Sequence, residues 1–245
     1  MTDFDYSSTL IDSKVRKDDT YMRPAITQAI SAIVPEVCDG IIEVLQEYVK
    51  APSTEEEWLT VAKEFKDKWN FPHFIGAVDG KHVMIQAPWN SGTEYHNYKN
   101  FFSIVLFALV DADYNFMYVD VGCQGRISDG GVFKNTNLYK KLENNTSNIP
   151  TPSALLVSYS LKIPYMILGD KAFALNQYTM RPFEGNPERG SIERIFNYRH
   201  SRARKVVGLY QKVGRKFGCV IYHWKALNER NTMVWVGGLK YVILT

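Results

Sequence analysis

The sequence has few cysteines, no long apolar run and no low-complexity segment. Its 245 residues include three cysteines, Cys38, Cys123 and Cys219, whose wide spacing fits neither a disulfide framework nor a zinc motif. So sparse a set of thiols favours a reducing compartment. The longest apolar run, residues 101–110 with Ser103 inside it, is too short to cross a bilayer. Together with an acidic, polar start unlike a secretory signal, these absences predict a soluble intracellular protein.

Charge is unevenly distributed along the chain. A composition of 45% hydrophobic and 22% charged residues is typical of globular proteins and excludes disordered and fibrous classes. Residues 1–70 carry a net charge of −6 and the remainder carries +9. The segment Arg194 to Lys225 holds nine basic residues and no acid. A basic run beside aromatic residues suits DNA, whereas a charge run alone is more often a solvated helix face.

The apolar pattern divides the chain into parts of different texture. Residues 1–24 are polar, and residues 25–70 have helical periodicity, with a capping-box signature at Ser53 and Glu56. Strand-like runs follow from residue 71. Four further features are predicted: a β run that turns at Asp79-Gly80, a hairpin over residues 102–121, a helix over residues 129–142 begun by Ser128, and a strand over residues 164–168. A long basic helical region is expected over residues 191–217. The order of elements predicts an α/β domain with a mixed sheet flanked by helices and preceded by a small N-terminal helical segment.

Three aspartates are candidates for a metal site. Asp79 and Asp170 each follow an apolar run of strand type, and the carboxyl ends of neighbouring strands meet at one edge of a sheet. Asp129 opens a helix and is a third candidate near that edge. Clustered carboxylates attract Mg²⁺ or Mn²⁺, which suits phosphodiester cleavage. Taken singly, Asp79 and Asp170 are more often turn formers, and a helix dipole alone explains Asp129.

Two residues next to the first aspartate are candidates for phosphate contact. Lys81 and His82 directly follow the Asp79-Gly80 dipeptide, so both could face a phosphate. His82 alternates with apolar Val83, which is equally typical of a half-buried strand residue.

Several ordered motifs give the sequence a specific resemblance. It resembles the PIF/Harbinger-type DDE transposases, the group that includes the Harbinger transposase-derived nucleases. The motifs that carry the resemblance extend over roughly residues 14–207 and include IGAVDGKHV (75–83), SDGGVF (128–133), LGDKAF (168–173) and IFNYRHSRARKVV (195–207).

The resemblance implies an RNase H-like fold over residues 71–207 and a Mg²⁺- or Mn²⁺-dependent nuclease that acts on DNA and is located in the nucleus, or in both the nucleus and the cytoplasm. The first two acids of the family fall on Asp79 and Asp170. The third, a glutamate after the Val-Val pair, falls on Gly208. Basic residues expected to contact nucleic acid are Lys81, Arg199, Arg202, Arg204 and Lys205. The family often works with a separately encoded Myb-like DNA-binding protein.

Two departures from the family pattern shape the functional hypotheses. Residues 25–70 look like a remnant of the family's helix-turn-helix region, and residues 208–245 form an atypical tail in place of the end of the catalytic domain. The sequence therefore predicts a DDE endonuclease domain impaired by the glycine at position 208. The alternative is a catalytically inactive, transposase-derived protein that binds nucleic acid or a partner. A third hypothesis is the non-functional product of a decayed element.

Overall fold

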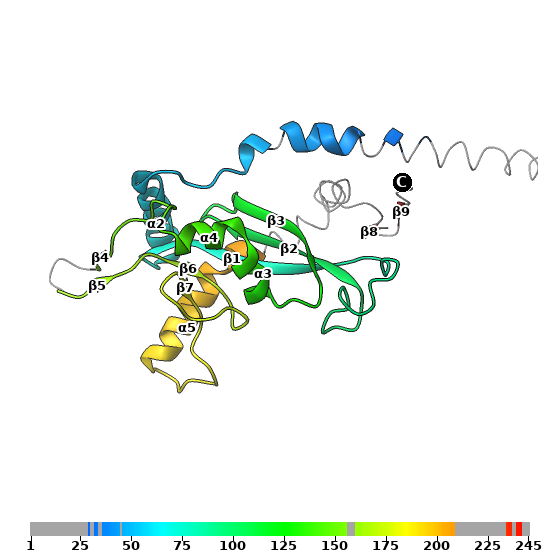
Figure 1. Cartoon of the computed structure of the whole chain (residues 1–245). Coiled ribbons are helices and arrows are strands. Elements are labelled where there is room, and N and C mark those ends of the chain that lie inside the picture. Colours follow the sequence, from blue (N-terminus) through cyan, green and yellow to red (C-terminus); the bar gives the residue numbers. More distant parts are fainter. Residues whose placement is uncertain are drawn as a thin grey trace, which may run out of the picture.

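The computed structural model describes residues 46–155 and 160–208, residues 29, 32–33 and 36–44, and the backbone of β8 (Val234–Val236) and β9 (Leu239–Tyr241). Its centre is a five-stranded mixed sheet (Figure 1). The strands are β1 (Phe74–Met84), β2 (Ser103–Val110), β3 (Phe116–Gln124), β6 (Met166–Leu168) and β7 (Thr179–Met180), in the spatial order β3-β2-β1-β6-β7. β1, β2 and β3 are antiparallel neighbours, whereas β6 pairs parallel to β1 and β7 parallel to β6. This mixed sheet confirms the predicted α/β class.

The hairpin of β2 and β3 is confirmed, and its sequence explains it. Every residue of β2 is buried, as expected for a continuous apolar run in the middle of a sheet. The carboxylate of Asp111 accepts hydrogen bonds from the backbone N–H groups of Asp113 (2.8 Å) and Asn115 (2.9 Å). These bonds close the turn that the sequence predicts between the two strands.

The predicted turn at Asp79-Gly80 is wrong, because β1 continues straight through these residues. Asp79 pairs with Ala108 and Gly80 pairs with Phe107 in an unbroken register along β2. The long apolar partner strand therefore satisfies the backbone groups that a turn would otherwise satisfy internally. Asp79 lies inside the longest strand of the sheet and not at its end.

The helix α2 (Glu55–Trp69) begins one residue later than the predicted capping box. Its N-cap is Thr54, whose hydroxyl accepts a hydrogen bond from the Glu57 N–H at 3.2 Å, while the Glu57 carboxylate accepts one from the Ser53 N–H at 2.6 Å. The helix ends at Asn70, whose φ of 52° is left-handed. Its apolar stripe is buried and the helix packs against β1, so this segment supports the sheet.

The helix predicted over residues 129–142 is two helices, α3 (Asp129–Asn135) and α4 (Asn137–Glu143). Thr136 separates them because its backbone is extended, and its hydroxyl caps α4 by accepting a hydrogen bond from the Tyr139 N–H at 3.1 Å. Ser128 caps α3 as the sequence predicts. Phe133 of α3 stacks on Phe107 of β2 with ring centroids 5.4 Å apart, which fixes α3 on this face of the sheet.

The basic helical region begins as α5 (Ile192–Ala203), with Ser191 as its N-cap. Arg204 interrupts it, and residues 205–208 are helical again. The rest of the predicted region, residues 209–217, lies outside the described residues. Figure 1 shows α3 and α4 in front of the strands and α5 behind them. The sheet is thus covered on both sides where β1 meets β6.

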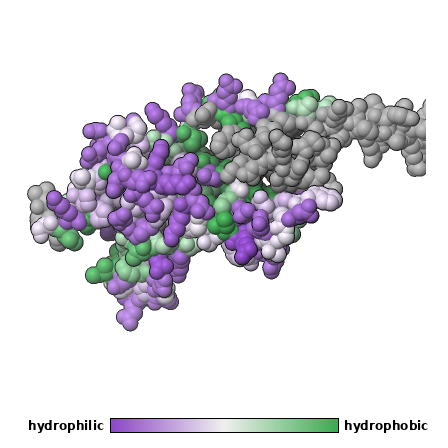
Figure 2. All heavy atoms as spheres, in the orientation of Figure 1, coloured by the Kyte–Doolittle hydropathy of each residue, from purple (hydrophilic) through white to green (hydrophobic). Residues whose placement is uncertain are grey.

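The outer elements are small. A 3-10 helix, η1 (Gln46–Tyr48), precedes α2, and the strands β4 (Ser153–Ala154) and β5 (Lys162–Ile163) form a separate pair, as do β8 and β9. Residues 36–44 are helical, as predicted for the lead-in, whereas the predicted polar segment 1–24 lies outside the described residues. Hydrophilic side chains cover most of the face seen in Figure 2, with hydrophobic ones in small patches. Within the described part of the chain, no helix is both long and apolar enough to span a membrane.

Candidate metal centre

The register between β1 and β6 places Asp79 beside Asp170. The two strands run parallel, and their last paired residues are Ala77 and Leu168. Each aspartate follows its paired residue by two positions, so both carboxylates lie just beyond the end of β6. Side chains two residues apart on a strand share one face of the sheet. The parallel register, not a strand end in β1, brings the two acids together.

Asp129 completes the cluster from the N-terminus of α3. One carboxylate oxygen from each of Asp79, Asp129 and Asp170 can be chosen so that all three lie within 4.8 Å of one another. Asp79 is buried, and the other two are partly exposed. Oδ1 of Asp129 is buried and has no hydrogen-bond partner among the described residues. Hard oxygen donors at this spacing, one of them unsatisfied, fit a divalent cation of the Mg²⁺ or Mn²⁺ type.

The electrostatic cost of this cluster falls on Asp129. Burial, followed by the charges of Asp79 and Asp170, raises the pKa of Asp129 to about 7, while Arg204 and Lys99 act in the opposite direction. A carboxyl group with this pKa is protonated in a large fraction of the molecules at neutral pH when no further cation balances the cluster. A pKa perturbed by burial and by like charges is typical of functional sites.

Arg204 forms ion pairs with two of the three acids. Its Nη2 lies 3.2 Å from Oδ1 of Asp79 and 3.4 Å from Oδ2 of Asp170. The residue follows the last residue of α5, and its side chain is 25% exposed. Asp170 also serves locally, because its Oδ1 accepts a hydrogen bond from the Ala172 N–H at 2.8 Å. The turn-forming role and the charged contact therefore coexist in Asp170.

A cavity of about 560 Å³ opens beside Asp79 and Asp170. Lys171 and a face of the α5 region contribute most of its remaining lining: Asn197, His200, Ser201, Arg204, Lys205 and Gly208. A β-carbon at position 208 would meet no atom of the described residues within 4 Å. The position where the family pattern has a glutamate therefore faces the same cavity as two acids and has room for a side chain.

His200 is the buried imidazole of this face. Its Nε2 lies 3.4 Å from the carbonyl oxygen of Met180, which can only accept, so Nε2 carries the proton. Burial lowers the pKa of His200 to about 4. His200 is therefore neutral at physiological pH and anchors α5 to β7, while Arg204, one helical turn further along, contacts the acids.

The structure brings together only some of the basic residues predicted to contact nucleic acid. Arg204 and Lys205 line the cavity, whereas Arg199 and Arg202 lie exposed on α5. Lys81 is half-buried in β1 and does not line this cavity.

His82, the other predicted phosphate contact, is a half-buried strand residue. Its Nδ1 lies 3.0 Å from Oγ of Ser103, and burial lowers the pKa of its imidazole. Of the two interpretations, the half-buried strand residue therefore describes the surroundings of His82.

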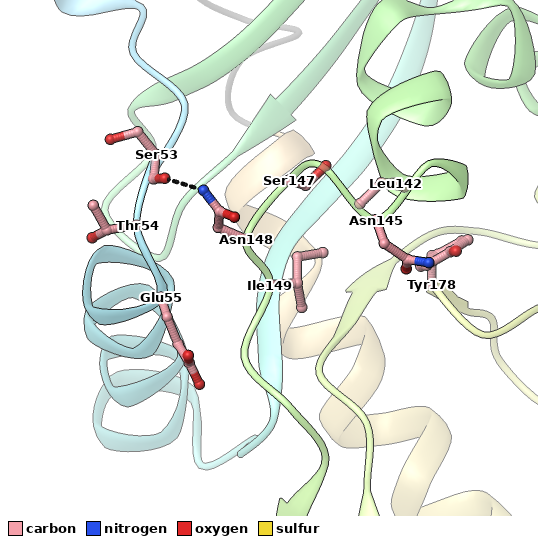
Figure 3. A pocket seen from close by; sticks show the side chains of 9 residues that line it. All are labelled: Ser53, Thr54, Glu55, Leu142, Asn145, Ser147, Asn148, Ile149 and Tyr178. Carbon is pink, nitrogen blue, oxygen red and sulfur yellow. Dashed lines mark hydrogen bonds between the residues drawn. The ribbon is translucent and has the colours of Figure 1, made fainter.

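A second cavity, of about 450 Å³, lies at the start of α2 (Figure 3). The side-chain amide of Asn148 donates a hydrogen bond to the carbonyl oxygen of Ser53 at 2.8 Å across it. The indole N–H of Trp58 donates to the carbonyl oxygen of Ser147 at 2.8 Å. No acid of the cluster lines this cavity, and its contacts are those of a joint between α2 and the loop after α4.

The site residues coincide with a known family. The profile of the DDE superfamily endonucleases matches residues 78–233. That range covers more than half of the chain and contains the whole acid cluster. The chain belongs to this family.

Several known proteins are similar in sequence to this DDE endonuclease domain. "Protein ALP1-like" of Arabidopsis thaliana is 30% identical over 164 residues, which are 60% of this chain and 37% of the relative. "Putative nuclease HARBI1" of Rattus norvegicus is 27% identical over 183 residues, 74% of this chain and 48% of the relative. Its human counterpart is 24% identical over 197 residues, 80% of this chain and 52% of the relative. The chain spans about half the length, or less, of these relatives, and no solved structure matches it significantly.

These similarities confirm the Harbinger resemblance, and the sheet with its flanking helices is the RNase H-like fold of DDE endonuclease domains. The chain is thus a domain of the DDE endonuclease family that is similar to the Harbinger transposase-derived nucleases. Sequence reasoning missed His200 and Lys171 as neighbours of the acids. The helical spacing of His200, Arg204 and Gly208, four residues apart, is the signal that would have placed them on one face.

Proposed function

We propose that this domain cleaves DNA phosphodiester bonds with the help of a divalent metal, and that its activity is weakened by the glycine at position 208. The observation that carries the proposal is the convergence of Asp79, Asp129 and Asp170 within 4.8 Å in a chain of the DDE endonuclease family. Mg²⁺ or Mn²⁺ is the cofactor class that such a donor set selects.

The metal would be held by Asp79 and Asp170, with Asp129 as a third oxygen donor. When bound, a divalent cation supplies charge stabilisation and an activated water. The chain's own residues orient the acids. Gly80 leaves room for Asp129, the Ala172 N–H fixes one oxygen of Asp170, and the register of β1 on β6 sets the spacing. The nucleic acid would contact the exposed Arg199, Arg202 and Lys205 on the side of the α5 region, and Lys81 on β1.

The impairment follows from Gly208. A carboxylate at this position would enter the cavity that Asp79 and Asp170 line, and no atom of the residues that the structure describes lies within 4 Å of its β-carbon. Without it the site holds one negative charge fewer than the family pattern. Loss of a group that stabilises charge in the transition state costs about 10²–10³ in rate. A catalytically inactive domain that binds nucleic acid is the second candidate, favoured by the same glycine.

Nicking of supercoiled plasmid in Mg²⁺ and in Mn²⁺ tests this proposal. We expect slow, metal-dependent nicking by the unmodified chain and nicking at least about 10²-fold faster after Gly208→Glu. Gly208→Gln is the matched control, because it adds the same bulk without the charge and should not accelerate the reaction. Asp170→Asn should abolish nicking in every background.

The outcomes separate the two candidates. No nicking by the unmodified chain or by Gly208→Glu, with DNA still bound, would leave the binding protein as the function. Nicking that survives Asp170→Asn would assign the activity to a contaminant or to another site, and would contradict the metal centre.

The expected cellular location and the expected partner protein are part of the same proposal, and both rest on the family resemblance alone. We expect a nuclear location, which imaging of a fluorescent fusion would test. We also expect recognition of specific DNA sites to depend on a separate Myb-like protein. Selection of sites by this chain alone from a random-sequence DNA pool would contradict that expectation.

A further inference from the structure

Arg204 occupies the place between the two acids where a cation is needed. A single nitrogen, Nη2, lies 3.2 Å from a carboxylate oxygen of Asp79 and 3.4 Å from one of Asp170. The side chain of Asp79 is 7% exposed. A buried carboxylate with no counter-charge is strongly unfavourable, so this guanidinium group stabilises the cluster in the absence of a metal.

The guanidinium group is not fully satisfied in this position. Nε of Arg204 is buried and has no hydrogen-bond partner among the described residues. Only Nη2 contacts the acids, and no bidentate pair of the strong, fork-like kind is formed. The contact is therefore one that a better-coordinating cation can replace.

The displaced side chain has room to move. Arg204 lines the cavity of about 560 Å³ together with Lys205 and Gly208, and in the described part of the chain no atom lies within 4 Å of where a β-carbon at position 208 would be. The guanidinium group can therefore leave the acids without entering the packed core. The guanidinium group stays positively charged after it leaves the acids, because arginine does not lose its proton in proteins.

We propose that Arg204 is a resident counter-cation of Asp79 and Asp170, which a divalent metal must displace, so that Arg204 sets the metal affinity of the site. The inference rests on the proposed metal centre. It assigns to Arg204 a role toward the acids in place of the DNA contact expected from its basic charge alone. Arg204 is a positioning residue in this role, because it acts on the metal ligands and not on the substrate.

Calorimetric titration of Mn²⁺ into the metal-free chain tests the proposal without measuring nuclease activity. We expect Arg204→Gln to bind Mn²⁺ at least about tenfold more tightly than the unmodified chain, because an opposing charge within 4 Å of the ligands is removed. Arg204→Lys keeps the charge and should stay close to the unmodified chain. Arg202→Gln, at the end of α5 but outside the cavity lining, removes the same charge and should change the affinity less than about threefold.

A second measurement needs no substitution. The guanidinium nitrogens of Arg204 in the unmodified, ¹⁵N-labelled chain should change their NMR signals as Mg²⁺ is added and saturate with the metal. Unchanged signals at saturating Mg²⁺ would overturn the proposal even if Arg204→Gln failed to fold. Equal or weaker Mn²⁺ binding by a folded Arg204→Gln would also overturn it.

Failure of this inference is distinguishable from failure of the metal centre itself. Mn²⁺ binding that Asp79→Asn abolishes, but that Arg204→Gln does not strengthen, would leave the metal centre standing and remove the role of Arg204. Absence of Asp79-dependent Mn²⁺ binding in the unmodified chain and in Arg204→Gln would remove the metal centre, and this inference with it.

Discussion

The carboxylate of Asp129 lies directly against the backbone of Gly80, so closely that a β-carbon at position 80 would lie 2.1 Å from Oδ1. Gly80 pairs with Phe107, whose ring stacks on α3, so position 80 faces α3. Asp79, its neighbour along the strand, points to the opposite face, where Arg204 meets it. The missing side chain at position 80 therefore lets an acid from one side of the sheet approach an acid from the other.

Gly80→Ala should disrupt the cluster through this contact. The added methyl group has to push away a short, partly buried side chain, which costs about 1–3 kcal/mol of the free energy of unfolding. Displacing Asp129, the third oxygen donor of the proposed site, should also lower Mn²⁺ affinity by about 10–100-fold. Chemical denaturation and calorimetry measure the two effects. Gly40→Ala is the matched control, because its β-carbon would meet none of the described residues within 4 Å. Mn²⁺ affinity unchanged by Gly80→Ala would contradict the placement of Asp129 in the cluster.

Asp129 should make the stability of the metal-free chain depend on pH. Its pKa is raised from 3.8 to about 7 in the folded state, so the folded chain holds a proton that the unfolded chain releases. This contribution to stability is fully present below pH 3.8 and is lost as the pH rises through 7. Asp129→Asn imitates the protonated form, and we expect it to raise the Tm of the metal-free chain by a few degrees at pH 8 and much less at pH 5.

Mn²⁺ should reverse the order of the Tm values of the unmodified chain and Asp129→Asn. The metal replaces the proton as the balancing charge, so it should stabilise the unmodified chain at pH 8 more than it stabilises Asp129→Asn. Thermal melts at both pH values, with and without Mn²⁺, make the comparison. A lower Tm for Asp129→Asn at pH 8 without metal would show that the ionised carboxylate is favourable there, against the expectation.

His200 should give a pH dependence of the opposite sign. Burial lowers its pKa from 6.5 to about 4. Between these two pH values the unfolded chain therefore binds a proton that the folded chain does not bind. The contribution of the neutral imidazole is present above pH 6.5 and is lost as the pH falls toward 4, by about 3 kcal/mol in all. We expect His200→Gln to remove most of this loss, measured by denaturation at pH 7 and pH 4.5. His96→Gln, which removes an imidazole away from α5, is the control, and an equal effect of both substitutions would contradict the assignment to His200.

The sequence predicted the class of the fold and singled out the three aspartates that the structure brings together, but it did not predict how they meet. Apolar runs and caps are local properties, so β2, the hairpin and the start of α3 could be predicted from them. The straight path of β1 through Asp79 and Gly80 depends on pairing with β2, which lies more than twenty residues further along the chain. The pairing outweighs the local preference of the Asp79-Gly80 dipeptide for a turn. No residue close to it in the sequence indicates that the pairing exists.

The contacts around the acids were harder to predict for the same reason. Arg204 is 125 residues from Asp79 in the sequence, and its basic charge predicted a contact with DNA instead of one with the acids. The break at Thr136 depends on an extended backbone between two short helices, although threonine itself is a common N-cap. Motifs identified the acids and a basic stretch, whereas the register of β1 on β6 and the path of α5 decided which of them touch.

The exposed basic residues of α5 should account for part of the affinity for DNA. Arg199 and Arg202 lie in solvent, so each could neutralise a phosphate and release its counterions. The double variant Arg199→Gln/Arg202→Gln should lower the slope of log affinity against log salt by about 2, because each phosphate contact contributes about 0.9. Fluorescence anisotropy with a duplex of arbitrary sequence between about 50 and 200 mM salt measures the slope. The double variant Lys63→Gln/Lys66→Gln removes the same charge from α2, where both lysines are exposed, and should leave the slope close to that of the unmodified chain. Equal slopes for the two double variants would mean that α5 attracts DNA only through net charge and does not lie on its backbone.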